Sequence, residues 1–280
     1  MLKKETAKQY NKAIKEYVNK FIDFLKEIYR KDKKNKHTLQ TDVNTFAKKY
    51  NYSFSKFNET EKKKSKLFDM LYVCSPKMIQ IIFNIIKSAG PVLVYSNYVL
   101  MEGLQIFKIY LNFFGFAAYD DSKKDKSKDF YRYMEFHGGV DKDTRFQNKN
   151  TFNEKDNLKG KVMKIIMISP AGAEGINLSN VRQVHILEPY WNEVRIEQVI
   201  GRAIRQCQHK DLPMKDRTVD VFRYKMIRNN GKETSDERME RISRKKNNLL
   251  ISFIEAIKQS AVDCELFKSH NMMGTKYSCF

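Results

Sequence analysis

The chain has 280 residues, of which 41% are hydrophobic, so it can bury a substantial core and is not a wholly disordered protein. Lys and Arg total 53 against 33 acidic residues, and the net charge of +20 favours a polyanionic partner, most often nucleic acid. No apolar run reaches membrane-spanning length and the start lacks a signal-peptide core, so we expect a soluble, intracellular protein with no membrane partner.

The N-terminal segment, residues 1–66, carries apolar residues at helical spacing between lysine-rich stretches. The run "YVNKFIDFLKEIY" predicts an amphipathic helix, whereas "RKDKKNK" and "EKKKSK" predict solvated basic connections. Two roles stay open for this basic helical segment, because its apolar faces suit packing and its lysines suit contact with nucleic acid.

The middle of the chain, residues 67–230, alternates short apolar runs with helical segments. Such alternation predicts an α/β fold in which helices cover both faces of a parallel sheet. Ligands of these folds gather beyond the carboxyl ends of the strands. The predicted strands are PVLVYS (91–96), YRYMEF (131–136), KVMKIIMIS (161–169), VRQVHILE (181–188) and TVDVFRYKMI (218–227).

The remaining residues, 231–280, predict a C-terminal helical tail of one or two helices. Thr234 or Ser235 can cap its start, and the acids of "SDERMER" suit a first helical turn. No metal site is expected, because the cysteines form no CxxC pair and no His, Asp or Glu cluster has ligand spacing.

A loop of small residues, "SPAGAEGIN" (169–177), directly follows the most apolar predicted strand. Gly172 and Gly175 permit close approach of a ligand to the backbone. A strand, a small-residue loop and a helix start together suit a phosphate group. Glycine-rich turns are often only turns, so the loop alone is a modest signal.

The stretch "IEQVIGRAIRQCQ" (196–208) predicts a helix with two different sides. Because each residue turns an α-helix by about 100°, Gln198, Arg202 and Arg205 fall together on one side. That side is either a solvated basic face or a ligand-binding face. The opposite side should pack on a core through Ile196, Val199, Ile200, Ala203 and Ile204.

Several blocks of the sequence resemble, in order, the motifs of the second motor lobe of superfamily-two helicases, particularly the Swi/Snf-like DNA-dependent ATPases. "VLVYSN" is similar to the strand of motif IV, "MISPAGAEGINL" to motif V and "QVIGRAIRQCQ" to motif VI. "FHGGVDKDTRFQNKNTFN" and "EPYWNEVRIEQ" resemble the segments before motifs V and VI. The resemblance covers about residues 70 to 265 and implies a RecA-like lobe. Within the family the chain looks like ATPases of large cytoplasmic DNA viruses, such as the small subunit of the poxvirus early transcription factor.

The resemblance implies that motif VI reaches a nucleotide bound by the first lobe. On this analogy Arg202 and Arg205 are arginine fingers that stabilise charge on the γ-phosphoryl of ATP, and Gln198 helps to hold the nucleotide. Asn177 lies where relatives place a polar residue near the nucleotide ribose, and Gly175 belongs to the same nucleotide-binding segment. Arginine suits this task because it stays charged and offers forked donors to phosphate oxygens.

A second set of residues is implied to contact nucleic acid at the ends of the strands. For His137 a hydrogen-bonded turn residue is an equal alternative. Contact should be mainly with phosphates, so affinity should fall with salt and depend little on base sequence. The set comprises Ser96, Asn97, His137, Gly138, Ser169, Ala171 and Gly172.

Two departures from the family pattern matter. Cys207 stands where the Swi/Snf-like proteins usually have glycine, so the end of motif VI should be shaped differently. The sequence has no GxxxxGK(S/T) phosphate loop and no Asp-Glu metal pair at a strand end, and phosphoryl transfer needs such groups. We therefore expect half of a two-lobe site. A first lobe, in cis or in trans, would hold Mg²⁺, and this chain alone would hydrolyse no ATP.

The sequence thus predicts the C-terminal lobe of a nucleic-acid-dependent ATPase, a helicase or translocase, with viral transcription as its candidate process. Its expected partners are DNA, with RNA as the alternative, a first RecA-like lobe and the transcription machinery. If the chain is viral, it belongs in the host cytoplasm or the virion. The competing interpretation is a non-catalytic nucleic-acid-binding or assembly module that keeps the motor fold without turnover.

Overall fold

The structure is a computed structural model that describes residues 2–35, 37–101, 103–119, 131–170 and 175–267. The chain forms two compact units. The first comprises Met1–Glu188 and Val199–Lys225, and the second comprises Pro189–Gln198 and Met226–Phe280. None of the described helices is long and apolar enough to cross a membrane.

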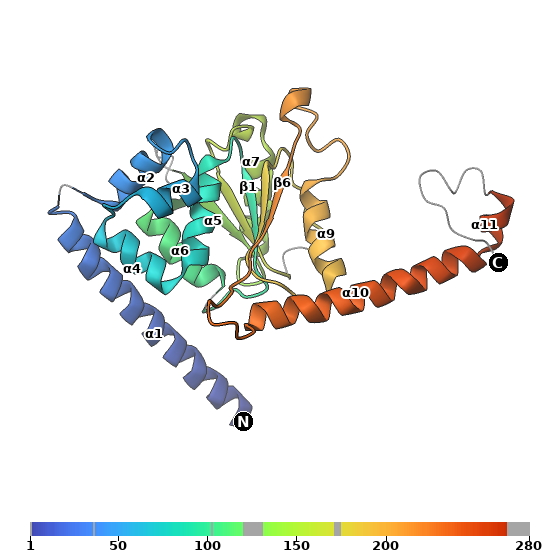
Figure 1. The fold of residues 1–280 in the computed structure, drawn as a ribbon, viewed down its shortest axis with the longest axis horizontal. Coiled ribbons are helices and arrows are strands. Elements are labelled where there is room, and N and C mark those ends of the chain that lie inside the picture. Colours follow the sequence, from blue (N-terminus) through green and yellow to red (C-terminus); the bar gives the residue numbers. More distant parts are fainter. Residues whose placement is uncertain (1, 36, 102, 120–130, 171–174, 268–280) are drawn as a thin grey trace. The chain divides into compact units, whose positions relative to one another are not determined.

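The first unit contains a six-stranded sheet (Figure 1) in the order β2-β3-β4-β1-β5-β6. Every neighbouring pair of strands is parallel, which confirms the predicted α/β fold with a parallel sheet. Tyr95 at the end of β1 pairs with Ile168 and Ile186, so the carboxyl ends of the central strands meet at one edge. The strands are β1 (Val92–Tyr95), β2 (Ala117–Ala118), β3 (Arg132–Phe136), β4 (Ile165–Ile168), β5 (Gln183–Ile186) and β6 (Asp220–Arg223).

The central strand β1 is buried on both of its faces. Val92 and Val94 belong to the main hydrophobic core, while Leu93 and Tyr95 are fully buried as well. Successive side chains of a strand point to opposite faces, so both faces of the sheet are covered here. Burial on both sides is the arrangement expected of a parallel sheet between layers of helices.

The helices begin where side chains can cap free backbone N–H groups. Ser75 Oγ accepts from the N–H of Met78 at the start of α5. Thr234, rather than Ser235, caps α10 and forms a capping box with Glu237. The described α-helices are α1 (Leu2–Asp32), α2 (Leu39–Lys48), α3 (Phe54–Thr60), α4 (Lys66–Cys74), α5 (Pro76–Lys87), α6 (Leu104–Phe113), α7 (Lys142–Asn153), α9 (Glu193–Ala203), α10 (Ser235–Ser260) and α11 (Val262–Leu266).

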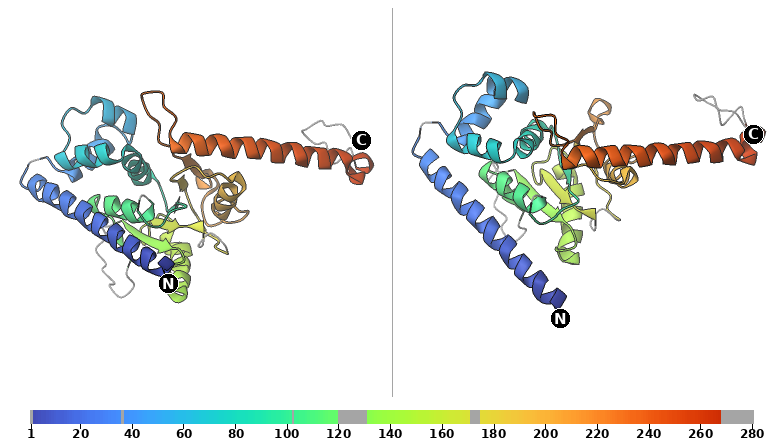
Figure 2. Two further views of the ribbon diagram at one scale, coloured as in Figure 1. Left: turned by 90° about the horizontal axis from the view of Figure 1, so that it is seen from below. Right: turned by 60° about the horizontal axis from the view of Figure 1, so that its bottom comes forward.

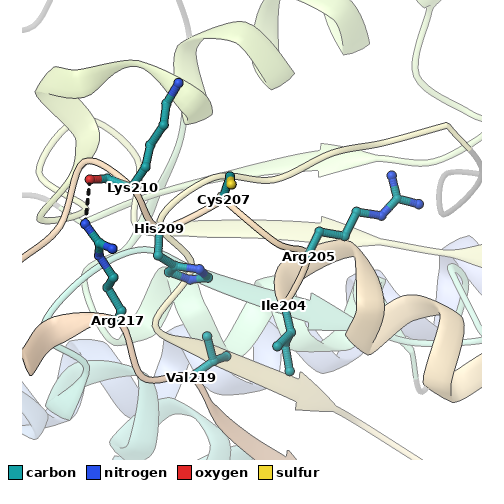
Figure 3. Close-up of a pocket in the computed structure, with 7 residues that line it drawn as sticks. All are labelled: Ile204, Arg205, Cys207, His209, Lys210, Arg217 and Val219. Carbon is teal, nitrogen blue, oxygen red and sulfur yellow. Dashed lines mark hydrogen bonds between the residues drawn. The ribbon is translucent and has the colours of Figure 1, made fainter. Parts of the chain in front are cut away.

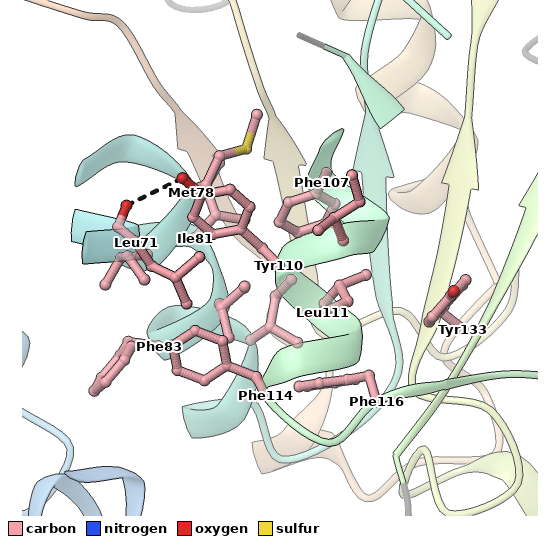
Figure 4. Packing of buried hydrophobic residues seen from close by; sticks show 14 of the residues in the cluster. Leu71, Met78, Ile81, Phe83, Phe107, Tyr110, Leu111, Phe114, Phe116 and Tyr133 are labelled. Carbon is pink, nitrogen blue, oxygen red and sulfur yellow. Dashed lines mark hydrogen bonds between the residues drawn. The ribbon is translucent and has the colours of Figure 1, made fainter. Parts of the chain in front are cut away.

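Helices α1 to α4 pack with α5 and α6 on one side of the sheet (Figure 1, Figure 2). Phe83 of α5 is the centre of this packing. Its ring centroid lies 4.4, 5.5 and 5.7 Å from those of Phe46, Phe57 and Phe114. Figure 4 shows Phe83 and Phe114 among the neighbouring apolar side chains. The N-terminal helices share one hydrophobic core with the sheet, so packing is one role of residues 1–66.

A partly buried chain of hydrogen bonds ties α5 to β5 and to the segment after β6. Asn84 Nδ2 donates to the Tyr224 hydroxyl at 2.8 Å, and that hydroxyl lies 2.9 Å from His185 Nδ1. His185 Nε2 lies 3.1 Å from Gln183 Oε1, and the imidazole stacks on the ring of Phe222. Complete burial lowers the pKa of His185 to about 3, so its ring is neutral near pH 7.

The second unit is built around α10. Ser243 Oγ of this helix donates to the Glu193 carboxylate at 3.3 Å, and Lys246 Nζ lies 4.3 Å from the centre of the Trp191 ring. Trp191 is therefore a packing partner of a lysine ammonium. The second half of α10 exposes a row of apolar side chains, namely Leu249, Leu250, Phe253, Ile254 and Ile257.

Candidate functional site

Polar residues lie at or just beyond the ends of four neighbouring strands of the sheet. Ser96 follows β1, His137 follows β3 and Ser169 follows β4. Glu188 comes after β5, with Leu187 between them. Because these strands are adjacent and parallel, the structure brings the four residues together at the carboxyl edge of the sheet.

A buried carboxylate, Glu188, organises the loop that follows β1. It accepts hydrogen bonds from Ser96 Oγ at 3.1 Å, from the backbone N–H of Asn97 at 2.5 Å and from Asn97 Nδ2 at 3.2 Å. Burial raises the pKa of Glu188, although these donors and the charge of Lys77 oppose the rise. Sequence reasoning missed Glu188, and the only signal was an acidic residue at the end of a buried strand.

The loop after β1 presents Asn97 rather than Ser96. The Ser96 side chain is fully buried, and its Oγ also lies 2.9 Å from the carbonyl oxygen of Tyr98. Asn97 is half-buried, and its Oδ1 accepts from the Tyr95 hydroxyl at 2.9 Å. In this conformation any nucleic-acid contact by the side chains of this pair falls to Asn97, while Ser96 shapes the loop.

His137 is held in a tight turn after β3. Its Nδ1 accepts from the N–H of Gly139 at 3.1 Å, so Nε2 carries the proton that it donates to Glu135 at 2.9 Å. Burial raises the pKa of Glu135, but the hydrogen bonds from His137 and Lys108 outweigh it and leave that pKa lowered. The structure gives His137 the bonds of a turn residue, and Gly138 beside it is exposed.

The glycine loop after β4 is described only in part. Ser169 is buried at the end of the strand, whereas Ala171 and Gly172 lie outside the described residues. Gly175 is exposed and has a φ of +76°, a left-handed conformation that glycine adopts without a steric cost.

Arg205 does not lie on the helix that the sequence predicted for it. Helix α9 ends at Ala203, so Arg205 belongs to the connection that follows. There its Nη1 donates to Asn177 Oδ1 at 2.5 Å, and both side chains are exposed. Asn153 Nδ2 in turn donates to the carbonyl of Asn177 at 2.9 Å. The predicted nucleotide-binding residues Asn177 and Arg205 are thus in direct contact.

Arg202 is half-buried and lies near the end of α9. Among the residues that the structure describes, no carboxylate pairs with Arg202 or with Arg205. Both arginines therefore keep donors for an anionic ligand. Gln198, also on α9, is exposed.

A pocket of about 390 Å³ opens beside Arg205 (Figure 3). Arg217 at its wall is held by the carbonyls of Leu212 at 2.8 Å and Lys210 at 3.0 Å. Cys207 also lines the pocket and has a φ of +65°. The cysteine thus keeps the left-handed backbone that a glycine would adopt most easily. Whether the end of motif VI differs in shape from that of the Swi/Snf-like proteins stays a prediction.

The chain is similar to known proteins in both its middle part and its full length. Residues 77–207 match the family model of the helicase conserved C-terminal domain. A protein of Acanthamoeba polyphaga mimivirus that carries the name of an ATP-dependent RNA helicase is 44% identical over 288 residues, which cover 99% of this chain and 34% of the relative.

Two further relatives are also viral. Nucleoside triphosphatase I of Melanoplus sanguinipes entomopoxvirus is 32% identical over 89% of this chain and 34% of the relative. A termination factor NPH-I homolog of African swine fever virus (isolate Pig/Kenya/KEN-50/1950) is 32% identical over 68% of this chain and 33% of the relative. The chain therefore spans about a third of the length of these relatives.

Proposed function

Because the chain belongs to the helicase conserved C-terminal domain family over residues 77–207, we propose that it is the second motor lobe of a nucleic-acid-dependent ATPase. Hydrolysis requires a first lobe that supplies the phosphate loop and the Mg²⁺ ligands. We expect no ATP hydrolysis by this chain alone, since its sequence contains no such loop.

The observation that carries the proposal is that neither of the two arginines is paired with a described carboxylate. Arg205 is exposed and bonded to the neutral amide of Asn177, and no described carboxylate neutralises Arg202 or Arg205. An amide holds a guanidinium in place without cancelling its charge. The two cations are therefore suited to phosphate oxygens, and we assign them the stabilisation of charge on the γ-phosphoryl group. Gln198 is proposed to hold the nucleotide, and Gly175 leaves its backbone open to the same ligand.

The carboxyl edge of the sheet is the proposed nucleic-acid rim. Among the described residues of the predicted nucleic-acid-binding set, Asn97 and Gly138 have accessible surface, and Ser96, His137 and Ser169 are buried at the strand ends. Ala171 and Gly172 complete the proposed rim. We propose DNA as the partner, and the name of the mimivirus relative makes RNA the competitor to test. The African swine fever virus relative carries the name of a termination factor, and we propose viral transcription as the process that this lobe serves.

The direct test is reconstitution with a first lobe, followed by Arg202→Ala and Arg205→Ala. Loss of an arginine finger should lower kcat on the order of 10³-fold with a smaller change in KM. Arg244→Ala is the matched control, because Arg244 is an exposed arginine of α10 that pairs with Glu240. Full nucleic-acid-stimulated hydrolysis in both finger variants would overturn the assigned role.

A non-catalytic nucleic-acid-binding module is the second candidate. The exposed lysines of residues 31–34 and 62–66 favour it, because they suit a polyanion without any need for turnover. The same reconstitution with a first lobe distinguishes the motor lobe from the non-catalytic module. Hydrolysis that depends on both lobes supports the motor, and tight binding without hydrolysis supports the module.

A further inference from the structure

Two lysine-rich connections, α1–α2 and α3–α4, meet at the start of helix α4. Asp32, at the end of α1, accepts the backbone N–H of Leu67 at 2.8 Å. Asp42 of α2 accepts the backbone N–H of Ser65 at 3.0 Å. These two bonds cross 35 and 23 residues of sequence and hold the connections side by side.

The two aspartates lie beneath the surface rather than among the lysines. Asp32 is 2% exposed and Asp42 is fully buried. Asp42 is further bonded to His37 Nε2 at 2.7 Å. Because their oxygens are occupied by N–H groups, the carboxylates fix the connections without forming ion pairs with the lysines.

The exposed lysines gathered by these bonds form a surface that we call the lysine cluster. Lys31 pairs with Glu27 at 2.7 Å, and Lys33 lies over the Tyr29 ring. The others have no ion-pair partner among the described residues, so the surface carries uncompensated positive charge. The lysine cluster comprises Lys31, Lys33, Lys34, Lys62, Lys63 and Lys66.

Lysine ammonium groups on flexible stems suit a row of phosphates better than a single carboxylate. Each is a compact point charge that can follow the spacing of a backbone, and each phosphate contact releases counterions. The helical layer beneath supplies a firm support, since Phe57 and Leu67 below the connections are fully buried. A charged surface on a rigid support loses little conformational freedom on binding.

We propose that the lysine cluster is a second docking surface for the phosphate backbone of nucleic acid, distinct from the residues of the strand-end rim. The identity of the partner rests on the proposed function. The surface adds affinity that depends on salt and not on base sequence. It gives residues 1–66 a binding role beside their packing role.

The test uses the full chain, a short fluorescent duplex and no nucleotide. Lys34, Lys62, Lys63 and Lys66 are changed together to alanine, and affinity is followed by fluorescence anisotropy as salt rises. The matched control changes Lys12, Lys15, Lys20 and Lys26 of α1, which are also exposed and remove the same charge. A third variant carries arginine at the four cluster positions and preserves their charge.

The cluster variant should bind about tenfold more weakly or worse near 0.1 M salt, and its slope of log K against log salt should be shallower by about 0.9 for each phosphate that the protein no longer neutralises. The arginine variant should keep its affinity, and the α1 control should weaken far less. Equal weakening in the cluster and control variants would overturn the proposal, because net charge alone would then explain both. Binding to vesicles rich in phosphatidylserine tests whether the lysine cluster binds an anionic lipid surface instead of nucleic acid. Weakened vesicle binding with unchanged duplex binding would also overturn it.

This experiment is independent of the motor chemistry. Arg244→Ala, at an exposed residue of α10 outside both the lysine cluster and the predicted nucleotide-binding residues, should leave duplex affinity unchanged. If the arginines fail their hydrolysis test while the cluster variant still binds more weakly, the motor assignment falls and the docking surface stands. If the arginine variants lose hydrolysis while the cluster variant binds the duplex normally, the motor assignment stands and the docking surface falls. Unfolding temperatures should match across the variants, since all the changed side chains are exposed.

Discussion

The guanidinium of Arg205 donates a hydrogen bond to the side-chain carbonyl of Asn177, at 2.5 Å. This bond joins the connection after α9 to the segment that follows the glycine loop. The backbone carbonyl of Asn177 accepts a hydrogen bond from Asn153 Nδ2. The partner of the arginine is neutral, so the arginine's position is fixed while its charge stays available.

Replacement of Asn177 by aspartate should therefore damage hydrolysis in the two-lobe enzyme. A carboxylate at this position would form an ion pair with Arg205 and compete with the phosphate group for it. We expect Asn177→Asp to lower kcat more than Asn177→Ala, as measured by steady-state kinetics. Asn248→Asp on α10 adds the same charge at an exposed residue and should have little effect. Equal kcat values for the two Asn177 variants would contradict this explanation.

Glycine at residue 207 should stabilise the protein. Cys207 is exposed and has a φ of +65°, which costs a residue with a side chain roughly 1–2 kcal/mol. Part of that gain is offset by the greater chain entropy of glycine in the unfolded state. Cys207→Gly should exceed Cys207→Ala in free energy of unfolding by about 1 kcal/mol, measured by denaturant titration. An alanine variant as stable as the glycine variant would rule out backbone strain here.

Stability should fall as the pH drops through the range in which an unfolded histidine gains its proton. Burial lowers the pKa of His185 to about 3, against about 6.5 in an unfolded chain. Between these values the unfolded state binds a proton that the folded state refuses. The contribution of His185 to the free energy of unfolding is therefore fully present above pH 6.5. Below pH 6.5 it decreases by about 1.4 kcal/mol for each pH unit.

The change at His185 can be isolated by comparison with a variant that does not titrate. His185→Gln should be less stable than the natural chain near pH 7, because it loses the stacked ring and its bonds. Its free energy of unfolding should decline less steeply between pH 6.5 and 5. If the free energies of unfolding of the two proteins declined in parallel over this pH range, groups other than His185 would account for the loss of stability in acid.

Phe83→Ala should be among the most damaging changes to the first unit. The ring is fully buried and lies against the aromatic rings of Phe46 in α2, Phe57 in α3 and Phe114 just after α6, so its removal leaves a cavity. We expect a loss of about 3–5 kcal/mol in the free energy of unfolding. Phe146→Ala is the control, because Phe146 is 61% exposed and should change stability little.

Five of the six described strands could be predicted from the sequence, and three of them, β1, β4 and β5, are short apolar runs that are buried throughout. The two-residue strand β2 was missed, because both of its residues are exposed and it is too short to form a pattern. The family resemblance implied that Ser96, His137 and Ser169 lie at the ends of strands, and in the structure each of them directly follows a strand. The end of α9 could not be predicted in this way, since Ile204 and Arg205 continue the helical pattern. A tertiary contact of Arg205, with Asn177 28 residues earlier in the chain, accompanies the departure from the helix.

Glu188 was missed for a related reason. Its hydrogen-bond partners Ser96 and Asn97 are 92 and 91 residues away in the sequence, and nothing local marks a carboxylate that will meet them. The meeting of the two lysine-rich connections is equally invisible, because it depends on Asp32 and Asp42 reaching backbone groups of a different helix. Patterns of neighbours reveal elements, whereas such contacts arise only when the sheet and its helices are assembled.

The shared core of the N-terminal helices and the sheet has a practical consequence for any shortened form of this protein. A chain begun at residue 67 would leave Phe83 and its neighbours facing water, without the rings of Phe46 and Phe57 that shield them. Such a fragment would aggregate on expression, even though it kept all the strands and both Arg202 and Arg205.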